Sequence, residues 1–319
     1  MEYKHYSKVF WDQVEKYGDR AALHHKTGDT WEEISWNEFG AQVKSIAKAL
    51  IDEGIGEQET VGIFSQNMPQ WTMVDIASLC IRAIPVPIYA TNTAKQAEYI
   101  INDAEIKILF VGDQDQYDKA MELMGNNKYL KKIVVFKPSV KIKGSDKVVY
   151  YADYLKAGQQ SSSNDEVQKR MEKGTPEDLL TFIYTSGTTG EPKGVMLTHS
   201  NVLFQRDAHD GRLVDPNDKD VSLAFLPLSH VFERIWTYYV IAKGMQNNYL
   251  ENPADIIEFI AEAKPTIMCA VPRFYEKIYA TVYNRLESAP PVRKKLFKWA
   301  VKVGAKHNNK KKDKKFIGP

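Results

Sequence analysis

Short apolar runs alternate with amphipathic stretches along this chain of 319 residues, and this alternation constrains the fold more than any other feature. Residues 60–67, 107–113 and 131–136 are typical of buried strands, whereas residues 39–54 and 71–83 carry apolar positions at helical spacing. Strands that alternate with helices favour a parallel sheet with helices on its faces. We therefore predict an α/β fold with parallel-rich sheets flanked by helices.

The second half of the chain repeats the alternation. Residues 194–205 predict a strand followed by a helix that is capped at Ser200 or Asn201. Residues 231–244 predict a helix with a glycine at its C-terminal end, and residues 266–272 predict a further strand.

A polar stretch at residues 157–170 is typical of a surface connection between two subdomains. We expect a first α/β subdomain at residues 1–176 and a second one at residues 177–319. Two units also agree with what a chain of this length suggests.

Composition excludes several classes of partner and site. The formal net charge is +2, which gives no preference for polyanions, so we predict no nucleic-acid partner. Cys80 and Cys269 lie in apolar runs without CxxC spacing, which predicts buried free thiols and a reducing cytoplasm. The longest apolar stretch, residues 74–90, contains Arg82 and falls short of the roughly 20 apolar residues of a spanning helix.

The stretch YTSGTTGEPKG, from Tyr184 to Gly194, follows an apolar strand pattern directly. Glycines let a backbone approach a ligand closely, and consecutive N–H groups form a concave anion site. Hydroxyls and one lysine would add donors and charge, although the P-loop pattern GxxxxGK[ST] does not align here. From composition alone the segment is either a phosphate-binding loop or a plain connection between two strands. The donors are Thr185, Ser186, Thr188, Thr189 and Lys193.

His230 ends a strand pattern and precedes a helix pattern, a position where binding residues are common in α/β folds. A structural hydrogen-bonding role is the alternative. For the neighbouring Glu233 and Arg234 we predict a local ion pair.

Four segments of the sequence resemble one enzyme superfamily. YTSGTTGEPKGVMLTH resembles the signature of the adenylate-forming enzymes, which include acyl-CoA synthetases, luciferases and peptide-synthetase adenylation domains. LPLSHVFER, AVPRFYEKIY and ASLCIRAIPVPIYATNT resemble the long-chain fatty acyl-CoA synthetase (long-chain-fatty-acid–CoA ligase) branch. The resemblance covers essentially the whole chain and implies the fold of the large N-terminal domain of these enzymes.

The resemblance also implies a reaction and its site. A fatty acid and ATP would form an acyl-adenylate with the help of Mg²⁺, and coenzyme A would then displace AMP. The loop would wrap the phosphates of ATP with Thr185, Ser186, Gly187, Thr188, Thr189, Gly190 and Lys193.

The same resemblance assigns roles to individual side chains. The Thr185 hydroxyl would help to hold Mg²⁺, and His230 would lie beside the acyl carboxylate or the adenylate. Phe274 or Tyr275 would gate the acyl tunnel, with core packing as the alternative, and Tyr184 would belong to the core rather than to the ligand site.

The family pattern continues beyond the motifs found here. Its adenine-side aromatic, its Mg²⁺ glutamate, its ribose aspartate and its C-terminal domain with the adenylation lysine match nothing in residues 1–319. We therefore expect the N-terminal part of a longer synthetase, with the C-terminal domain absent, an incomplete fold and no turnover by this chain alone. The alternative is a non-catalytic acyl- or nucleotide-binding or interaction domain derived from that family.

The basic region of residues 293–315 has two interpretations. Leu296, Phe297, Ala300 and Val301 share one face of a predicted helix that is surrounded by lysines. The helix is either a solvated surface element or a contact with an anionic membrane, which would suit an enzyme that takes lipid substrates. We expect a cytoplasmic protein with peripheral membrane contact as an option.

Overall fold

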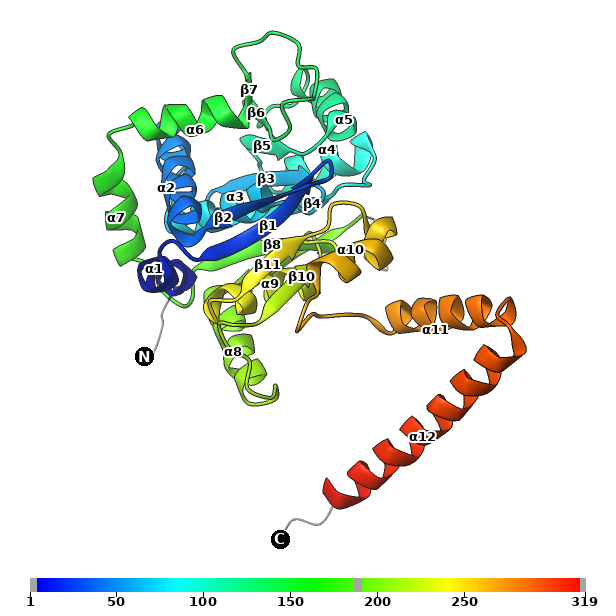
Figure 1. Cartoon of the computed structure of the whole chain (residues 1–319). Coiled ribbons are helices and arrows are strands. Elements are labelled where there is room, and N and C mark those ends of the chain that lie inside the picture. Colours follow the sequence, from blue (N-terminus) through cyan, green and yellow to red (C-terminus); the bar gives the residue numbers. More distant parts are fainter. Residues whose placement is uncertain (1–4, 186–190, 316–319) are drawn as a thin grey trace. The chain divides into compact units, whose positions relative to one another are not determined.

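The computed structural model describes residues 5–185 and 191–315, and the side chains of residues 310–315 are outside this description. The chain divides into two compact units, Met1–Cys269 and Ala270–Pro319, each of which is described by itself. Figure 1 labels the elements of both units.

The strands all belong to the first unit. They are β1 (Ala21–Thr27), β2 (Thr30–Ser35), β3 (Thr60–Ser65), β4 (Ile84–Tyr89), β5 (Ile108–Val111), β6 (Lys132–Val135), β7 (Val148–Tyr150), β8 (Leu179–Thr185), β9 (Lys193–Thr198), β10 (Val221–Ala224) and β11 (Gln246–Tyr249).

The helices of the first unit alternate with these strands. They are α1 (Tyr6–Tyr17), α2 (Trp36–Asp52), α3 (Pro69–Cys80), α4 (Ala94–Asp103), α5 (Gln114–Met124), α6 (Tyr151–Gln160), α7 (Asn164–Glu172), α8 (His199–Asp210), α9 (Val231–Ala242), the 3-10 helix η1 (Pro253–Asp255) and α10 (Ile256–Ala263).

The predicted parallel sheet is confirmed. It has five strands in the order β4-β3-β5-β6-β7, and every neighbouring pair in it is parallel. Helices α3, α4 and α5 separate the first four of these strands in sequence, whereas residues 136–147 connect β6 to β7 without a helix. Each connection is long enough for a parallel crossover.

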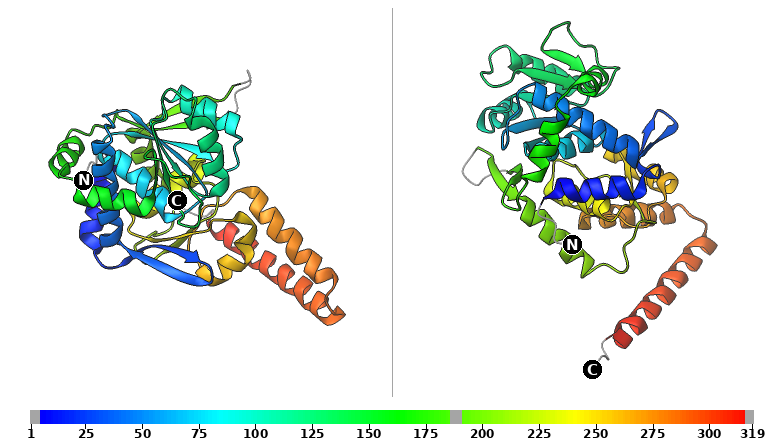
Figure 2. Two further views of the ribbon diagram at one scale, coloured as in Figure 1. Left: turned by 90° about the horizontal axis from the view of Figure 1, so that it is seen from above. Right: turned by 90° about the vertical axis from the view of Figure 1, so that its left-hand side faces the viewer.

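Successive residues of these strands pack on opposite faces of the sheet, because side chains alternate across a strand. Ile63 and Phe110 join the core under α1, α2, α3 and α6, whereas Phe64 and Val111 join the core under α4 and α5. Figure 2 shows these helix layers from two further directions. Both faces of the sheet are therefore covered, and its strands are apolar nearly throughout.

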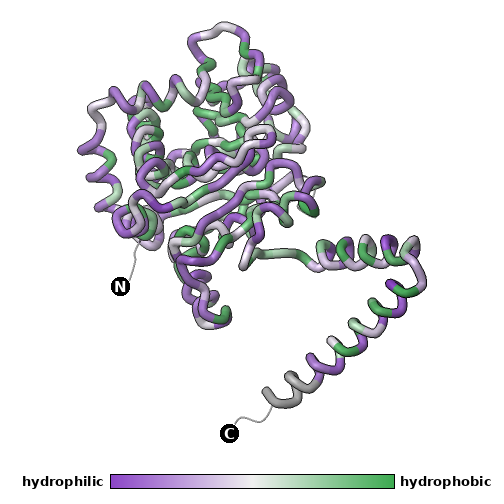
Figure 3. Tube along the Cα trace, viewed as in Figure 1, coloured by the Kyte–Doolittle hydropathy of each residue, from purple (hydrophilic) through white to green (hydrophobic). Residues whose placement is uncertain are grey.

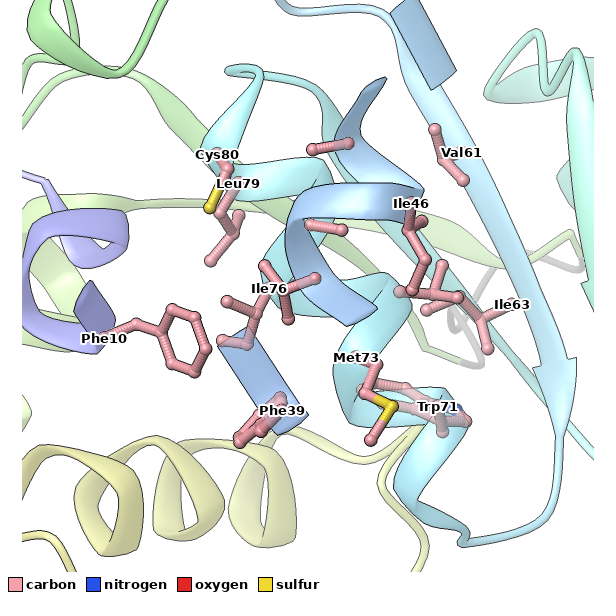
Figure 4. Packing of buried hydrophobic residues seen from close by; sticks show 14 of the residues in the cluster. Phe10, Phe39, Ile46, Val61, Ile63, Trp71, Met73, Ile76, Leu79 and Cys80 are labelled. Atoms are coloured by element: carbon pink, nitrogen blue, oxygen red, sulfur yellow. The ribbon is translucent and has the colours of Figure 1, made fainter. Parts of the chain in front are cut away.

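The larger core lies where α1, α2 and α3 meet the sheet. Figure 4 shows Phe10 of α1 and Phe39 of α2 with the apolar side chains of α3 and β3. Figure 3 shows that apolar positions follow the central strands, whereas α7 is mostly hydrophilic.

Cys80 and Cys269 are buried free thiols, as predicted.

A second sheet has the order β10-β11-β1-β2, with parallel pairs up to β1 and an antiparallel β1–β2 pair. It joins strands from the first 35 residues to strands after residue 220. The predicted division of the chain at residue 176 stays a prediction.

Two local predictions were wrong. Residues 266–272 form no strand, because the N–H groups of Thr266 and Ile267 both bond to the single carbonyl of Val221 and Pro272 already begins the next helix. Helix α8 begins two or three residues earlier than predicted, because Thr198 rather than Ser200 or Asn201 is its N-cap and forms a capping box with Asn201.

The second unit consists of α11 (Pro272–Glu287) and α12 (Pro291–Lys315). The ring of Tyr283 on α11 meets the ring of Phe297 on α12 edge to face, with centroids 5.7 Å apart. No helix within the described residues is long and apolar enough to span a membrane.

Two buried histidines join α1 to α8. The rings of His5 and His199 stack with centroids 3.5 Å apart, and the Tyr6 N–H donates to His199 Nδ1 at 3.0 Å. Burial lowers the pKa of His5 to about 4, against a partial opposing effect of Asp178, and lowers the pKa of His199 well below its usual range. Both rings are therefore neutral in the folded protein at neutral pH.

We expect the free energy of unfolding to decrease as the pH falls from 6.5 to about 4. In that range the unfolded histidines bind protons and the folded pair does not. The His5 shift alone corresponds to a loss of about 3 kcal/mol, at about 1.4 kcal/mol per pKa unit. Urea denaturation across this range should show a shallower decrease for the double variant His5→Asn/His199→Asn than for the exposed control His307→Asn. If the free energy of unfolding fell equally steeply with pH in both variants, His5 and His199 would not be the buried neutral groups that cause the decrease.

Candidate functional site

The hydroxyl-rich loop is carried by a β-hairpin. Strands β8 and β9 pair antiparallel, with Thr185 opposite Lys193. Both side chains are exposed, so the hairpin presents a hydroxyl and an amine at the same level, at the base of the loop. The remaining predicted loop residues, Ser186, Gly187, Thr188, Thr189 and Gly190, lie outside the described residues. The segment therefore connects two paired strands, as one of the two interpretations predicted. Phosphate binding by this segment stays a prediction.

The stem of the hairpin is fixed to α4 by Tyr184. The Tyr184 hydroxyl donates to Asp103 Oδ2 at 2.6 Å, and burial followed by this contact raises the pKa of the phenol, which keeps it a donor. Gly194 lies opposite Tyr184, and a Cβ there would come within 3.1 Å of the tyrosine ring. The missing side chain therefore lets the ring reach the core, where the sequence prediction placed it.

Strand β8 is also held at its base, through Thr181. The Thr181 hydroxyl donates to the Pro85 carbonyl of β4 at 2.7 Å and accepts from Arg234 Nη1 at 2.6 Å. Arg234 belongs to α9, the helix that His230 precedes. The guanidinium of Arg234 therefore connects α9, the helix after His230, to β8, the strand before the loop.

His230 lies at the N-cap of α9, and its side chain is exposed. Its Nδ1 accepts the N–H of Phe232 at 3.2 Å. Because Nδ1 acts as an acceptor, the proton of the neutral ring lies on Nε2. The ring can therefore donate a hydrogen bond to an anionic or carbonyl oxygen outside the helix.

The predicted ion pair between Glu233 and Arg234 was wrong. Arg234 pairs instead with Asp75 of α3, through Nη2 to Oδ1 and through Nε to Oδ2 at 3.1 Å. Consecutive helix positions differ in direction by about 100°, so neighbouring charges on a helix do not face each other. The hydroxyl of Tyr238 completes the buried group by donating to Asp75 at 2.8 Å.

Glu233 is buried in a different environment. Its Oε2 accepts the N–H of Leu226 at 3.0 Å and lies 3.5 Å from the sulfur of Cys269. Burial raises the pKa of this carboxyl to about 8, so it is protonated at neutral pH. The side chain therefore acts as a neutral hydrogen-bonding group.

The acyl-gate candidates belong to the second unit. Phe274 and Tyr275 lie in the first turn of α11 with ring centroids 5.7 Å apart, and Tyr275 is exposed. Their role as a gate stays a prediction, and the alternative of core packing is not supported for Tyr275 within its own unit.

Two functional candidates were missed in the sequence. Asp75 is a lone carboxylate in the apolar helix pattern of residues 71–83, and such a residue needs a buried partner. Asn67 lies two residues after the end of strand β3, at the strand end where parallel sheets carry binding residues. Both signals are visible in the sequence, but neither identifies the partner.

The predicted magnesium ion has little support in the described residues. Mg²⁺ prefers several oxygen ligands in octahedral geometry, and among the described residues only the Thr185 hydroxyl was predicted to supply one. No group of three or more His, Cys, Asp or Glu side chains in the described ranges could hold a metal. These residues do not form a magnesium site by themselves, and no step is derived through the ion.

The sequence matches a family model described as AMP-binding enzyme over residues 10–312. Long-chain-fatty-acid–CoA ligase ACSBG2 of Homo sapiens is 30% identical over 95% of this chain and 46% of its own length. Fatty acyl-CoA synthetase A of Dictyostelium discoideum is 31% identical over 86% of this chain and 41% of its own length. The chain therefore spans less than half of the length of these curated relatives.

Solved structures share the fold. The adenylation domain of a carboxylate reductase from Mycobacterium chelonae has a TM-score of 0.75 and 19% identity, over 90% of this chain and 49% of that chain. A long-chain-fatty-acid–CoA ligase from Archaeoglobus fulgidus has a TM-score of 0.71 and 22% identity, over 90% of this chain and 55% of that chain. The predicted fold class, the large N-terminal domain of such enzymes, is confirmed.

We expect Asp75→Asn to lower the free energy of unfolding by about 3–5 kcal/mol, because it leaves the buried Arg234 charge without its partner. The matched control is Asp115→Asn, which removes one partner of the exposed Lys119–Asp115 pair and should cost less than about 1 kcal/mol. The double variant Asp75→Asn/Arg234→Met should recover much of the loss. Urea denaturation measures all three, and equal small losses for Asp75→Asn and its control would contradict the pairing.

Proposed function

The chain belongs to the AMP-binding enzyme family, and from this premise we propose that it forms the N-terminal portion of an ATP-dependent long-chain fatty acid–CoA ligase. The predicted family resemblance is confirmed by the match over residues 10–312. The proposed substrate class follows the names of the long-chain-fatty-acid–CoA ligases that match 95% of the chain. The observation that carries the proposal is the β8–β9 hairpin, which sets Thr185 opposite Lys193 at the base of a Gly/Ser/Thr loop.

The proposed reaction has two displacement steps. A carboxylate oxygen of the fatty acid attacks the α-phosphorus of ATP, the bond from that phosphorus to the bridging oxygen breaks, and pyrophosphate leaves. The sulfur of coenzyme A then attacks the acyl carbon, AMP leaves with the bonding electron pair, and the thiol proton passes to solvent.

The loop serves the first of these steps. Positioning and electrostatic stabilisation dominate phosphoryl-type displacement, since charge moves onto the departing phosphates. Lys193 supplies a cation at the hairpin base, and Thr185 supplies a hydroxyl opposite it. The hydrogen bond between Tyr184 and Asp103 anchors the strands next to Thr185 and Lys193. It therefore fixes the backbone positions from which these two side chains extend.

His230 serves the acyl side in this proposal. Its exposed ring is oriented by the Phe232 N–H, so that Nε2 carries the proton of the neutral form. A donor in this position can bind the fatty-acid carboxylate or the oxygens of the acyl-adenylate. The guanidinium of Arg234 ties the helix after His230 to the strand before the phosphate loop.

We also propose that α12 contacts an anionic membrane surface. Val292, Leu296, Trp299 and Val303 follow one another at spacings of four, three and four residues, and all four are exposed. Lys295, Lys302 and Lys306 lie along one edge of this stripe by helical spacing. Phe297, which the sequence prediction placed on the apolar face, instead meets Tyr283 of α11.

In the complete enzyme that carries this chain, we expect Lys193→Ala to slow ATP–pyrophosphate exchange by about ten- to a hundredfold. A hydrogen bond to a charged group is worth about 1.5–3 kcal/mol, and each 1.4 kcal/mol or so is about tenfold in rate. The exposed Lys147→Ala is the control and should exchange like the wild type. Fatty-acid binding without ATP should be unchanged in both variants. Wild-type exchange by Lys193→Ala would rule out the hairpin as the phosphate site.

For the membrane contact, we expect this chain to sediment with phosphatidylserine-containing vesicles and not with phosphatidylcholine vesicles. The triple variant Lys295→Glu/Lys302→Glu/Lys306→Glu should lose this binding, because each basic residue near an anionic surface contributes about 1 kcal/mol. The triple variant Lys141→Glu/Lys143→Glu/Lys147→Glu makes the same charge change in another exposed segment and should still bind. Equal loss in both variants, or equal binding to both kinds of vesicle, would contradict a contact through α12.

A further inference from the structure

The short loop between β10 and α9, residues 225–230, carries His230 and is held by the side chain of Asn67. Asn67 Nδ2 donates to the carbonyls of Ala224 at 3.3 Å and Leu226 at 2.8 Å. Its Oδ1 accepts the N–H of Leu228 at 2.9 Å. The amide thus bonds to three alternate residues: Ala224 at the end of β10, and Leu226 and Leu228 in the loop.

Asn67 is itself placed firmly. It is only 6% exposed, and it lies between the end of β3 at Ser65 and the start of α3 at Pro69. Helix α3 is buried almost throughout and belongs to the larger core. The contacts to the loop therefore come from a part of the molecule that has little freedom to move.

Glu233 holds the same loop from the other side. Its carboxyl oxygen accepts the N–H of Leu226, the residue whose carbonyl accepts from Asn67. Leu226 is thus bonded at both of its backbone groups by side chains from two different elements. These two hydrogen bonds restrict the position of the backbone at Leu226.

His230 follows this held segment within two residues. The His230 N–H donates to the Pro227 carbonyl at 2.9 Å, and the ring is oriented by the N–H of Phe232. A displacement of the backbone at residues 226–228 therefore moves the histidine with it. Misplacement of a catalytic group by about 1 Å can cost about a hundredfold in rate.

We propose that Asn67 is a positioning residue for His230: its hydrogen bonds to the last residue of β10 and to two residues of the β10–α9 loop set where the imidazole meets the acyl carboxylate. This inference rests on the proposed function, which places His230 in the acyl site. Asn67 is buried and acts through the loop, so it is not assigned a contact with the substrate. Its effect should appear in the rate of adenylation rather than in the affinity for ATP.

The test is a double-mutant cycle in the complete enzyme that carries this chain, with palmitate as the fatty acid. The variants are Asn67→Ala, His230→Ala and the double variant, and ATP–pyrophosphate exchange gives kcat and the KM for ATP. We expect Asn67→Ala to lower kcat by about ten- to a hundredfold with little change in the KM for ATP. In the His230→Ala background the same substitution should lower kcat by less than about threefold, since coupled sites are not additive.

A matched control separates positioning from stability. Asn248 is equally buried and its amide donates to the Ser222 carbonyl of β10 at 2.9 Å, away from the loop. Asn248→Ala should lower the melting temperature without lowering kcat by more than about threefold. If Asn67→Ala does not fold, Asn67→Asp keeps the shape and the acceptor for Leu228 and removes both donors, and it should lower kcat in the same way.

The outcomes distinguish the two levels of the inference. Full loss of kcat on Asn67→Ala in both backgrounds, or a lower melting temperature with unchanged kcat, would overturn positioning through His230 and leave the acyl-site role intact. Wild-type exchange by His230→Ala would remove the acyl-site role itself, and positioning through His230 with it. Glu233→Gln keeps an acceptor for the Leu226 N–H in place of a carboxyl that is already neutral, so near-normal kcat in that variant would support a loop held by this hydrogen bond.

Discussion

The buried pair of Arg234 and Asp75 is the contact on which the arrangement of this molecule depends. Both side chains are almost fully removed from water, where an isolated charge is strongly destabilising. The pair persists because Thr181 and Tyr238 satisfy further donors and acceptors around it. Through these contacts one guanidinium joins α3, α9 and β8, elements that lie far apart in the sequence. The helix after His230 and the strand before the hydroxyl-rich loop are consequently fixed to the same buried group.

The hydroxyl-rich loop and His230 lie on short segments whose bases are held by polar contacts that are at least partly buried. The β8–β9 hairpin is anchored by Tyr184 to Asp103, and the β10–α9 loop is bonded by Asn67 on one side and by Glu233 on the other. The exposed groups Lys193 and His230 therefore have defined backbone positions. A site built in this way needs few charged residues of its own, which agrees with the ordinary composition of the chain.

Periodicity was sufficient to predict a parallel sheet flanked by helices, because β3, β5, β6 and the helices carry strong and different apolar patterns. It did not predict the three-residue strand β7. It failed at residues 266–272, where an apolar run resembles a strand but has only one neighbouring carbonyl to bond. Two parts of the candidate site could be selected from the sequence, because the loop and His230 stand out by residue type and position, and their roles stay predictions. Asp75, Asn67 and the true partner of Arg234 could not be assigned, because their contacts join residues that are about 160 positions apart and depend on packing alone.

The central claim is that the hairpin base and His230 mark the two ends of one adenylation site. The most direct measurement is a crystal structure of the complete enzyme with palmitate and α,β-methylene ATP, which cannot release pyrophosphate. The account predicts the β- and γ-phosphates against Thr185 and Lys193, and the palmitate carboxylate within about 2.6–3.2 Å of the His230 ring. Triphosphate bound away from the hairpin, or a carboxylate remote from His230, would contradict it.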